Sequence, residues 1–439
     1  MLKVGYVGLG AMGSSLSKHL TECFDLTVFD RNPVAVAALV AQGAKAAQSC
    51  AELARSCDVI VLCLPRTSDV QDILFGQNSL AEGLAPGKLV IDQTSGIPRE
   101  TAAIAKNLAS RGVAMIDAPV SGGVPAAQNR KVTVIASGSD AAWATAEPVL
   151  HAMTNSVFRC SNRVGDGQAL KLVNNAIGAG YRMATLELVA LGRKMGLGLL
   201  TLVQALNNGP GANFTTRHML VGVVEGRSTT NFALALMLKD LNAALSLGAE
   251  TASPMPMTTG ARGLMQMGFN LFGKESVLDD VIPLTEKLSD VKFKIDDGAS
   301  HVLPVEMDEA DLLTLIDRAT MVCNAVAVCE CVAMGHRFGL SMPQMARILN
   351  VGSAWSKTSE IMLPALASRS APQSGCTLAD AQTALATVVE QAALFGIPLT
   401  LPNAALNLMH SIDNMSKDQD QDFGMIVEIF AGTREMLLS

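Results

Sequence analysis

The sequence of 439 residues contains no basic cluster, since 33 Lys and Arg residues are set against 40 Asp and Glu residues for a net charge of −7. This balance argues against nucleic acid or an anionic membrane as a main partner. The sequence also begins without a signal-peptide pattern. Two long uncharged stretches, 195–216 and 391–412, are interrupted by Pro, Gly and Asn, so neither predicts a membrane-spanning helix. We therefore expect a soluble protein with no membrane partner.

Cysteine forms no disulfide pattern. The nine cysteines are an odd number scattered through the chain, which is typical of reduced thiols and predicts a cytoplasmic location. The tightest cluster is Cys329-x-Cys331 with His336 nearby. No second ligand pair follows at a usual zinc spacing, so no metal site is predicted.

The length and the 49% hydrophobic content predict two or three domains with ample core. Residues 1–161 alternate short β-branched runs with helical stretches, such as Pro33–Ala41 with Pro in its first turn. The predicted strands are Val4–Val7, Leu26–Phe29, Val59–Leu64, Leu89–Asp92, Ala114–Ala118 and Val132–Ala136. This alternation predicts a parallel, doubly wound sheet.

From about residue 162 the strand signals fade and helical patterns repeat. Ala169–Asn175 lines up with Leu312–Arg318, and at the same offset Gly196 falls on Gly339. A shorter offset then matches Leu238-Lys239-Asp240 to Leu378-Ala379-Asp380. The sequence thus predicts three domains, a dinucleotide-binding domain over 1–161 and two copies of one helical domain over 162–295 and 305–439.

A glycine-rich turn follows the first predicted strand and precedes a helix. It matches G-x-G-x-x-G, in which the glycines permit a tight turn, a close approach of the backbone to a pyrophosphate and helix–strand packing. The helix N-terminus supplies unpaired N–H groups and a partial positive charge. The candidate cofactor-binding residues in this turn are Gly8, Gly10, Ala11, Met12 and Gly13.

Asp30 follows the second predicted strand, about 20 residues after the glycine-rich turn, where an acid binds ribose hydroxyls. Asp30 favours NAD, because a carboxylate repels a ribose phosphate. Arg31 could instead pair with that phosphate, so NAD and NADP both stay open. Asp30, Arg31 and Asn32 are therefore all candidate cofactor residues.

Several motifs, in this order, resemble the β-hydroxyacid dehydrogenase family, which includes 3-hydroxyisobutyrate dehydrogenase and is related to 6-phosphogluconate dehydrogenase. The motifs are Gly5–Gly13, Leu64-Pro65, Asp92-x-Thr94-Ser95, Asp117–Gly123, Gly165-x-Gly167-x-x-x-Lys171-x-x-x-Asn175 and Lys239-Asp240. The resemblance covers residues 1 to about 290, and the second helical copy, absent from the common short members, departs from it. Together with the duplication it implies an α/β Rossmann domain followed by two tandem all-α domains of the 6-phosphogluconate dehydrogenase type. It also implies NAD or NADP as cofactor.

The resemblance further assigns roles to residues. Lys171 is expected to be the general acid/base, with Asn175 on the same helix face to orient the substrate or the lysine. Ser121, Gly122 and Gly123 form a loop whose hydroxyl and N–H groups suit a small anion. The residues expected on the cofactor side are Leu64, Pro65, Thr94 and Lys239.

The second helical copy provides an internal comparison. It carries Thr314 in place of Lys171 and Arg318 in place of Asn175, so packing alone does not demand Lys and Asn there. By the shorter offset Lys239 becomes Ala379 while Asp240 persists as Asp380, which indicates a functional lysine and a structural aspartate. We expect one active site per chain and a structural role for the second copy.

These observations predict an NAD(P)-dependent dehydrogenase or reductase acting on a small β-hydroxy acid. A β-hydroxy phosphonate such as 2-hydroxypropylphosphonate is also considered, because the tandem layout is similar to that of 2-oxopropylphosphonate reductases. The alternatives are oxidative decarboxylation of a hydroxy acid and a non-catalytic dinucleotide-binding interaction module. The two helical copies could pair within one chain, which would allow a monomer, but the large apolar helical surface favours a homodimer.

Overall fold

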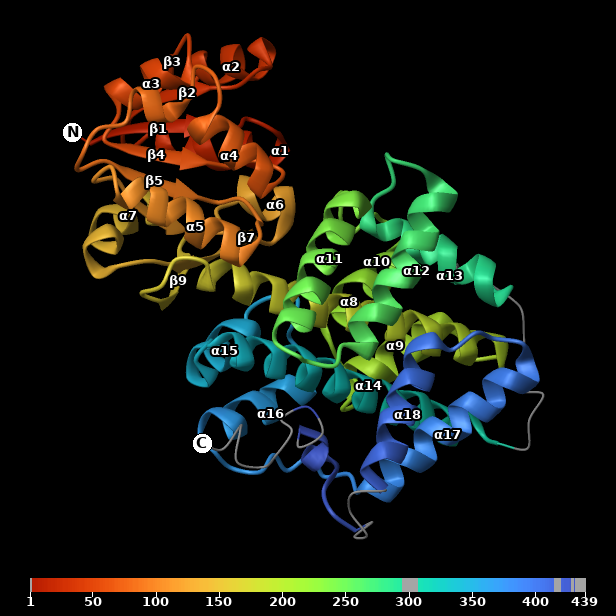
Figure 1. Cartoon of the computed structure of the whole chain (residues 1–439). Helices are drawn as coiled ribbons and strands as arrows, with labels where there is room; N and C mark the ends of the chain where they lie inside the picture. Colours follow the sequence, from red (N-terminus) through yellow and green to blue (C-terminus); the bar gives the residue numbers. More distant parts are fainter. Residues whose placement is uncertain (1, 294–306, 414–419, 428–429, 431–439) are drawn as a thin grey trace. The chain divides into compact units, whose positions relative to one another are not determined.

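The computed structural model describes residues 2–293, 307–413, 420–427 and 430. The chain divides into two compact units, Met1–Leu172 and Val173–Ser439 (Figure 1). The division falls inside one long helix, α8 (Asp166–Lys194), which supplies the end of the first unit and the start of the second. The first unit is an α/β unit and the second is entirely helical in its described residues.

The α/β unit contains one sheet with the strand order β3-β2-β1-β4-β5-β6-β8-β7, and β9 pairs with β8. The strands are β1 Lys3–Val7, β2 Asp25–Phe29, β3 Lys45–Ala46, β4 Val59–Leu62, β5 Leu89–Asp92, β6 Ala114–Asp117, β7 Val120–Ser121, β8 Thr133–Ser137 and β9 Ser156–Ser161. The six predicted strands are confirmed. The all-parallel prediction is wrong beyond β6, because β8 runs antiparallel to both β6 and β7.

Helices cover both faces of this sheet, as expected for a doubly wound fold (Figure 1). Successive residues of a strand point to opposite faces of the sheet, so each face needs its own cover. In β4, Val59 and Val61 belong to the apolar core on one face, and Ile60 and Leu62 belong to the core on the other. The helices are α1 Ala11–Ser17, α2 Pro33–Val40, α3 Cys50–Ser56, α4 Thr67–Phe75, α5 Pro98–Ala109, α6 Gly123–Gln128 and α7 Asp140–Met153.

The helical unit is built around α8 and α14 (Glu309–Phe338). The others are α9 Leu199–Asn208, α10 Leu220–Glu225, α11 Leu234–Glu250, α12 Pro256–Phe272, α13 Val281–Ser289, α15 Met342–Leu349, α16 Lys357–Ala367, α17 Leu378–Phe395 and α18 Thr400–Asp413. By length and composition α14 could cross a membrane, but 72% of its most apolar window is buried inside the helical unit. This burial is typical of a core helix.

Two buried glutamates join the helical copies reciprocally. Glu187 on α8 accepts hydrogen bonds from the backbone N–H groups of Thr400 (2.7 Å) and Leu401 (2.9 Å) at the start of α18. Glu330 on α14 accepts from Met257 (2.8 Å) and Thr258 (2.7 Å) at the start of α12. The two glutamates lie 143 positions apart, so each copy caps a helix of the other.

Backbone contacts between the two helical copies are reciprocal in the same way. Asn213 and Ser356, also 143 positions apart, pair with each other in an antiparallel bridge. The Phe214 N–H donates to Trp355 O and the Lys357 N–H donates to Ala212 O. Exchange of equivalent contacts is the property of a two-fold interface. The predicted duplication is therefore confirmed, with the copies facing each other across an internal pseudo-two-fold axis.

The predicted alignment of the copies is wrong in one helix. α11 begins after Ala233 and α17 after Thr377, which lie 144 positions apart, and each of these N-cap residues makes an isolated bridge. Lys239 therefore corresponds to Thr383, and Asp240 to Ala384 rather than Asp380. A shift of about one helical turn keeps apolar residues on the same face, so the sequence pattern could not exclude the wrong register. Asp240 is thus particular to the first copy.

Candidate active site

The glycine-rich turn places backbone close to where a pyrophosphate would bind. Gly8 has φ +96°, a conformation that favours glycine. A Cβ atom on Gly13 would lie 1.9 Å from the carbonyl oxygen of Gly8, which explains the third glycine. Around Gly10, by contrast, a Cβ atom would meet nothing within 4 Å. Gly10 also precedes α1, whose first turn holds Ala11 and Met12, so this open position is suited to a dinucleotide pyrophosphate.

This geometry predicts different effects for alanine at Gly13 and at Gly10. Gly13→Ala is expected to destabilise the α/β unit by about 1–3 kcal/mol, because the new methyl group collides with backbone. Gly10→Ala is expected to leave unfolding without cofactor unchanged and to weaken cofactor binding by about tenfold or more, because the methyl group occupies the space kept open for the ligand. Thermal unfolding and NADH and NADPH titrations measure both. Wild-type affinity in Gly10→Ala would contradict the assignment of this turn.

Asp30 is fixed by backbone donors at the end of β2. Its two carboxylate oxygens accept from the N–H groups of Leu9 (2.6 Å) and Asn32 (2.7 Å). Asn32 in turn caps α2 by accepting from Val34 N–H at 3.1 Å, while Arg31 is exposed. The acid is thus held against the glycine-rich turn. Both the acid that favours NAD and the arginine that could bind a phosphate are present, so the structure keeps both cofactors open.

The two loops predicted to flank the nicotinamide are joined. The Leu64 N–H donates to Thr94 Oγ1 at 3.1 Å, and the Thr94 N–H donates to Asp92 Oδ1 at 2.9 Å. These loops follow β4 and β5, whose carboxyl ends lie side by side in the sheet. Ligands of open α/β sheets bind at this edge. Pro65, next to Leu64, is exposed at the same edge.

The predicted acid/base meets the predicted anion loop. Lys171 on α8 is only 7% exposed, and its Nζ donates to Ser121 Oγ at 3.0 Å. Gly122 and Gly123 follow Ser121 with φ +128° and +74°, which favour glycine and leave the loop without side chains there. The α/β unit therefore brings together an ammonium group, a hydroxyl group and the glycine backbone of the anion loop.

Asp117 is a residue whose role in this site the sequence did not indicate. It is fully buried at the end of β6, and it accepts hydrogen bonds from Ser137 Oγ, the Gly165 N–H (2.8 Å) and the Gln168 N–H (2.8 Å). Asp117 thereby ties the sheet to the first turn of α8, one turn before Lys171. Burial raises its pKa to about 7, although these three donors oppose the rise.

This raised pKa has a consequence for stability. The carboxyl group of Asp117 loses its proton near pH 3.8 when unfolded and near pH 7 when folded. Its contribution to stability is thus fully present below about pH 4 and is lost as the pH rises through about 7. Urea unfolding at about pH 5 and about pH 8 is expected to show this decrease in wild type and a smaller one in Asp117→Asn. Equal decreases in both proteins would contradict this pKa.

In the helical unit Asn175 belongs to a chain of polar contacts. Its Nδ2 donates to Asp240 Oδ2 at 2.7 Å, and Asp240 Oδ1 lies 3.1 Å from Lys239 Nζ. Asn174 Nδ2 donates to Asn175 Oδ1 at 3.2 Å, which fixes the orientation of the amide. Asp240 thus links two residues that the sequence had assigned separately, to the substrate and to the cofactor.

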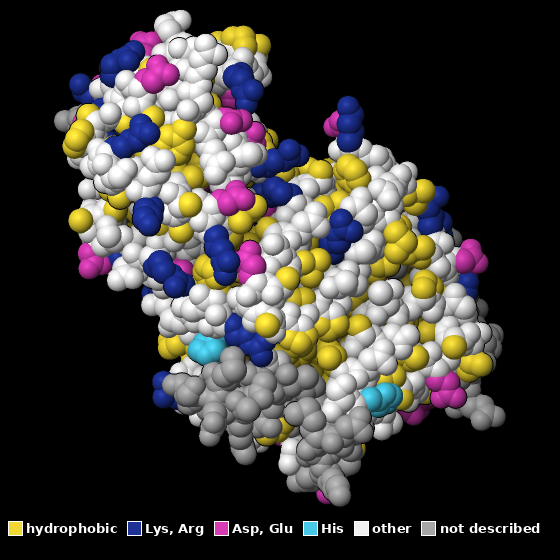
Figure 2. Space-filling view, in the orientation of Figure 1, with side chains coloured by type: hydrophobic (Ala, Val, Ile, Leu, Met, Phe, Trp, Pro, Cys, Tyr) yellow, Lys and Arg dark blue, Asp and Glu magenta, His cyan; other side chains and the backbone are white. Residues whose placement is uncertain are grey.

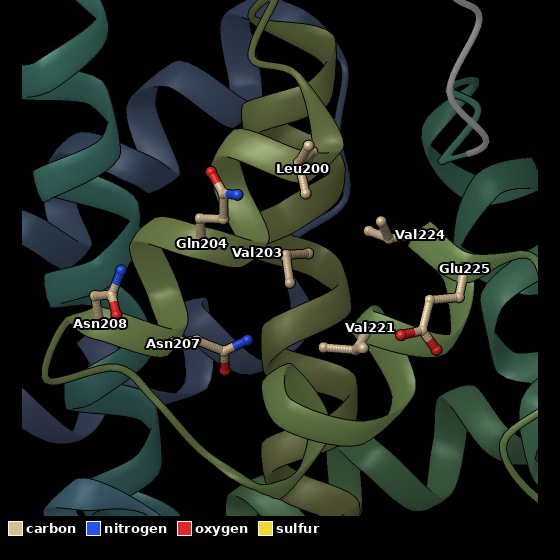
Figure 3. Close-up of a pocket in the computed structure, with 8 residues that line it drawn as sticks. All are labelled: Leu200, Val203, Gln204, Asn207, Asn208, Val221, Val224 and Glu225. Carbon is tan, nitrogen blue, oxygen red and sulfur yellow. The ribbon is translucent and has the colours of Figure 1, made fainter.

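A hollow elsewhere in the helical unit contains none of the predicted site residues. It has a volume of about 330 Å³ and lies between α9 and α10 (Figure 3). Its walls are mostly apolar, with polar groups at the margins: Leu200, Val203, Gln204, Asn207, Asn208, Val221, Val224 and Glu225.

On the face drawn in Figure 2, the α/β unit carries Lys and Arg interspersed with Asp and Glu, and hydrophobic side chains are spread over the helical unit.

Known proteins share these features. The family described as the NAD binding domain of 6-phosphogluconate dehydrogenase matches residues 3–162. The family described as NAD-binding of NADP-dependent 3-hydroxyisobutyrate dehydrogenase matches residues 165–284 and 313–430, more than half of the chain. The 2-(hydroxymethyl)glutarate dehydrogenase of Eubacterium barkeri is 32% identical over 66% of this chain and 97% of its own length. The chain belongs to the β-hydroxyacid dehydrogenase family. It is an NAD(P)-dependent oxidoreductase acting on CH–OH groups.

Two solved structures are similar to different extents of this chain. Psf3, in complex with NADP+ and 2-OPP, matches 64% of this chain and 99% of its own, with 25% identity and a TM-score of 0.58. It thus leaves about a third of this chain unmatched, so the expected similarity of the tandem layout to that of 2-oxopropylphosphonate reductases is not supported by this structure. The 6-phosphogluconate dehydrogenase of Plasmodium falciparum covers 95% of this chain with a TM-score of 0.70, and at 15% identity it shows the fold alone. The predicted Rossmann unit followed by tandem helical copies is confirmed.

Proposed function

We propose that this β-hydroxyacid dehydrogenase interconverts a small β-hydroxy acid and its oxo form, with Lys171 as acid/base. The hydrogen bond from Lys171 Nζ to Ser121 Oγ carries the proposal, because it joins the acid/base to the anion loop at 3.0 Å. A carboxylate bound by Ser121, Gly122 and Gly123 then brings the β-hydroxyl group of the substrate near the lysine.

Each residue has a defined task. The bound nicotinamide ring supplies the hydride acceptor for oxidation and the hydride donor for reduction. Neutral Lys171 takes the proton of the substrate hydroxyl group as the carbon is oxidised, and the ammonium form returns it during reduction. Asn175, oriented by Asp240, donates to the reacting oxygen, and Lys239 is assigned to cofactor binding. Gly8–Gly13, Asp30–Asn32, Leu64, Pro65 and Thr94 hold the cofactor.

The name of a relative supports this substrate class. In 2-(hydroxymethyl)glutarate, after which one relative is named, a hydroxyl group lies β to a carboxylate. A 2-hydroxyalkyl phosphonate such as 2-hydroxypropylphosphonate places its hydroxyl group similarly with respect to its anion, so it is the second candidate. We also propose a cytoplasmic homodimer, which light scattering would test.

The test follows nicotinamide absorbance with NAD+ and NADP+ against 3-hydroxyisobutyrate, 2-(hydroxymethyl)glutarate and 2-hydroxypropylphosphonate. We expect reduction with at least one of them, without release of carbon dioxide. Stoichiometric carbon dioxide would instead favour oxidative decarboxylation. If none of these compounds reduces the cofactor although the protein binds it, the proposal is overturned.

A further inference from the structure

The loop between α15 and α16 contacts the helix that carries Asn175. On α8, the buried residue Asn174 accepts at Oδ1 from the Ala354 N–H at 3.3 Å. Its Nδ2 donates to Ser353 Oγ at 2.9 Å. All of these residues belong to the helical unit, and the loop belongs to its second copy. The second copy therefore binds the side chain next to a proposed active-site residue.

Two glycines allow this loop to lie close to α8. A Cβ atom on Gly178, one helical turn after Asn174, would lie 3.1 Å from Ser353 Oγ. A Cβ atom on Gly352 would lie 2.8 Å from Asn174 Oδ1. Both distances are shorter than an ordinary van der Waals contact, so a side chain at either position would displace the loop or the residue that it meets.

These contacts define the orientation of two side-chain amides. A backbone N–H can only donate, so the oxygen of Asn174 faces Ala354 and its nitrogen faces the other way, toward Ser353. That nitrogen also donates to Asn175 Oδ1 at 3.2 Å. The nitrogen of Asn175 consequently faces Asp240 Oδ2, to which it donates at 2.7 Å. An amide nitrogen carries two hydrogens, so the second N–H of Asn175 can serve a substrate oxygen.

The reverse contact, from the first copy to the second, shares only the backbone hydrogen bond. Asp317 corresponds to Asn174 at the offset of 143 positions. Gly211, which corresponds to Ala354, donates its N–H to Asp317 Oδ1 at 3.0 Å. This backbone contact is therefore a property of the two-fold interface, and an acidic acceptor is sufficient for it.

The side-chain part of the contact occurs only beside Asn175. Ser353 corresponds to Pro210, whose side chain has no hydrogen-bonding group, and an ionised Asp317 has no donor. The interface therefore does not require a hydroxyl group at 353 or an amide at 174. Both groups are found where their neighbour on α8 is the proposed active-site amide.

We propose that Ser353 is a positioning residue of the active site, through which the second helical copy holds Asn174 and thereby the amide of Asn175. This inference rests on the proposed function, in which Asn175 donates to the reacting oxygen. The second copy, expected from the sequence to be structural, thus also orients a group that acts on the substrate.

Two variants on either side of the contact test this role with the acid that the wild type oxidises. Ser353→Ala is expected to lower kcat about 3- to 10-fold, the size of one net hydrogen bond. Asn174→Asp keeps the acceptor for the Ala354 N–H but places a carboxylate oxygen against Asn175 Oδ1, so kcat should fall further, about 10- to 100-fold. Asp317→Asn makes the opposite exchange in the second copy and should keep wild-type kcat.

The effect of Ser353 is expected to pass through Asn175. In an Asn175→Ala background, Ser353→Ala should therefore lower kcat no further, because the amide that it positions is gone. An equal loss in both backgrounds would show that Ser353 acts on the fold in general, and it would overturn the proposal. Wild-type kcat in Ser353→Ala would also overturn it.

A measurement without turnover separates this inference from the function on which it rests. In protein labelled with ¹⁵N-asparagine, the side-chain amide signal of Asn175 is assigned by its loss in Asn175→Ala. We expect Ser353→Ala to shift this signal or to speed its hydrogen exchange, and Asp317→Asn to leave it unchanged. An unchanged signal in Ser353→Ala would overturn the proposal even in an active enzyme. A changed signal in a protein that oxidises no acid of the panel would support the positioning role although the proposed function had failed.

Discussion

Replacing Lys171 by Ala is expected to lower kcat by about 10²- to 10⁴-fold while NADH and NADPH still bind. The lysine is almost fully buried, and its Nζ lies 3.0 Å from Ser121 Oγ, so its loss removes the group proposed to move the substrate proton. The glycine-rich turn and Asp30, which would hold the cofactor, are not altered by this change. Steady-state kinetics and cofactor titration of the same preparation measure both parts.

The control for this variant lies on the same helix. Lys194 in the last turn of α8 pairs with Asp290 at 3.2 Å and is more exposed than Lys171, so Lys194→Ala should keep wild-type kcat. A Lys171→Ala enzyme with turnover near that of wild type would exclude this lysine as the acid/base. Loss of cofactor binding would instead indicate a wider disturbance of the α/β unit.

Replacing Glu330 by Ala is expected to destabilise the protein by about 3–5 kcal/mol. The substitution removes the acceptor for the Met257 and Thr258 N–H groups at the start of α12, and both donors are then left buried and unpaired. The reciprocal change, Glu187→Ala, should have a similar effect through Thr400 and Leu401. Urea unfolding followed by circular dichroism measures both free energies.

An exposed glutamate on the same helix serves as the control. Glu309 lies in the first turn of α14, and Glu309→Ala should cost only a few tenths of a kcal/mol, roughly the size of a surface helix-dipole interaction. If Glu330→Ala and Glu187→Ala both remain within about 1 kcal/mol of wild type, the reciprocal caps do not hold the helical copies together.

The fold of the α/β unit could be predicted because its signals are local. Buried strands such as Val59–Leu62 and the glycine-rich turn before α1 have a recognisable composition and spacing. The antiparallel direction of β8 has no such signature, since a buried strand of apolar residues shows the same pattern in either direction. The duplication was visible, but the register of α17 was not, because a helix shifted by one turn keeps its apolar face.

Site residues could be predicted from the sequence only where a motif indicates their chemical role. Lys171, Asn175 and Ser121 have chemical groups whose use follows from their motifs. Asp117 acts through hydrogen bonds to the Gly165 and Gln168 N–H groups, which are distant in sequence and exist only once the chain has folded. Comparing the two helical copies at an offset of 143 positions could have pointed to further residues. At this offset Glu187 corresponds to Glu330, and the buried Arg182 corresponds to Ala325.

The most direct test of the whole account follows the hydrogen that leaves the substrate. The wild-type enzyme is incubated with cofactor and with 2-(hydroxymethyl)glutarate deuterated at the hydroxyl-bearing carbon, and the reduced cofactor is analysed by mass spectrometry. We predict one deuterium in each reduced nicotinamide. The Lys171→Ala variant is expected to form no deuterated cofactor on the same timescale. Reduced cofactor without deuterium, or no reduction by a wild-type enzyme that binds cofactor and this acid, would contradict direct hydride transfer from a β-hydroxy acid.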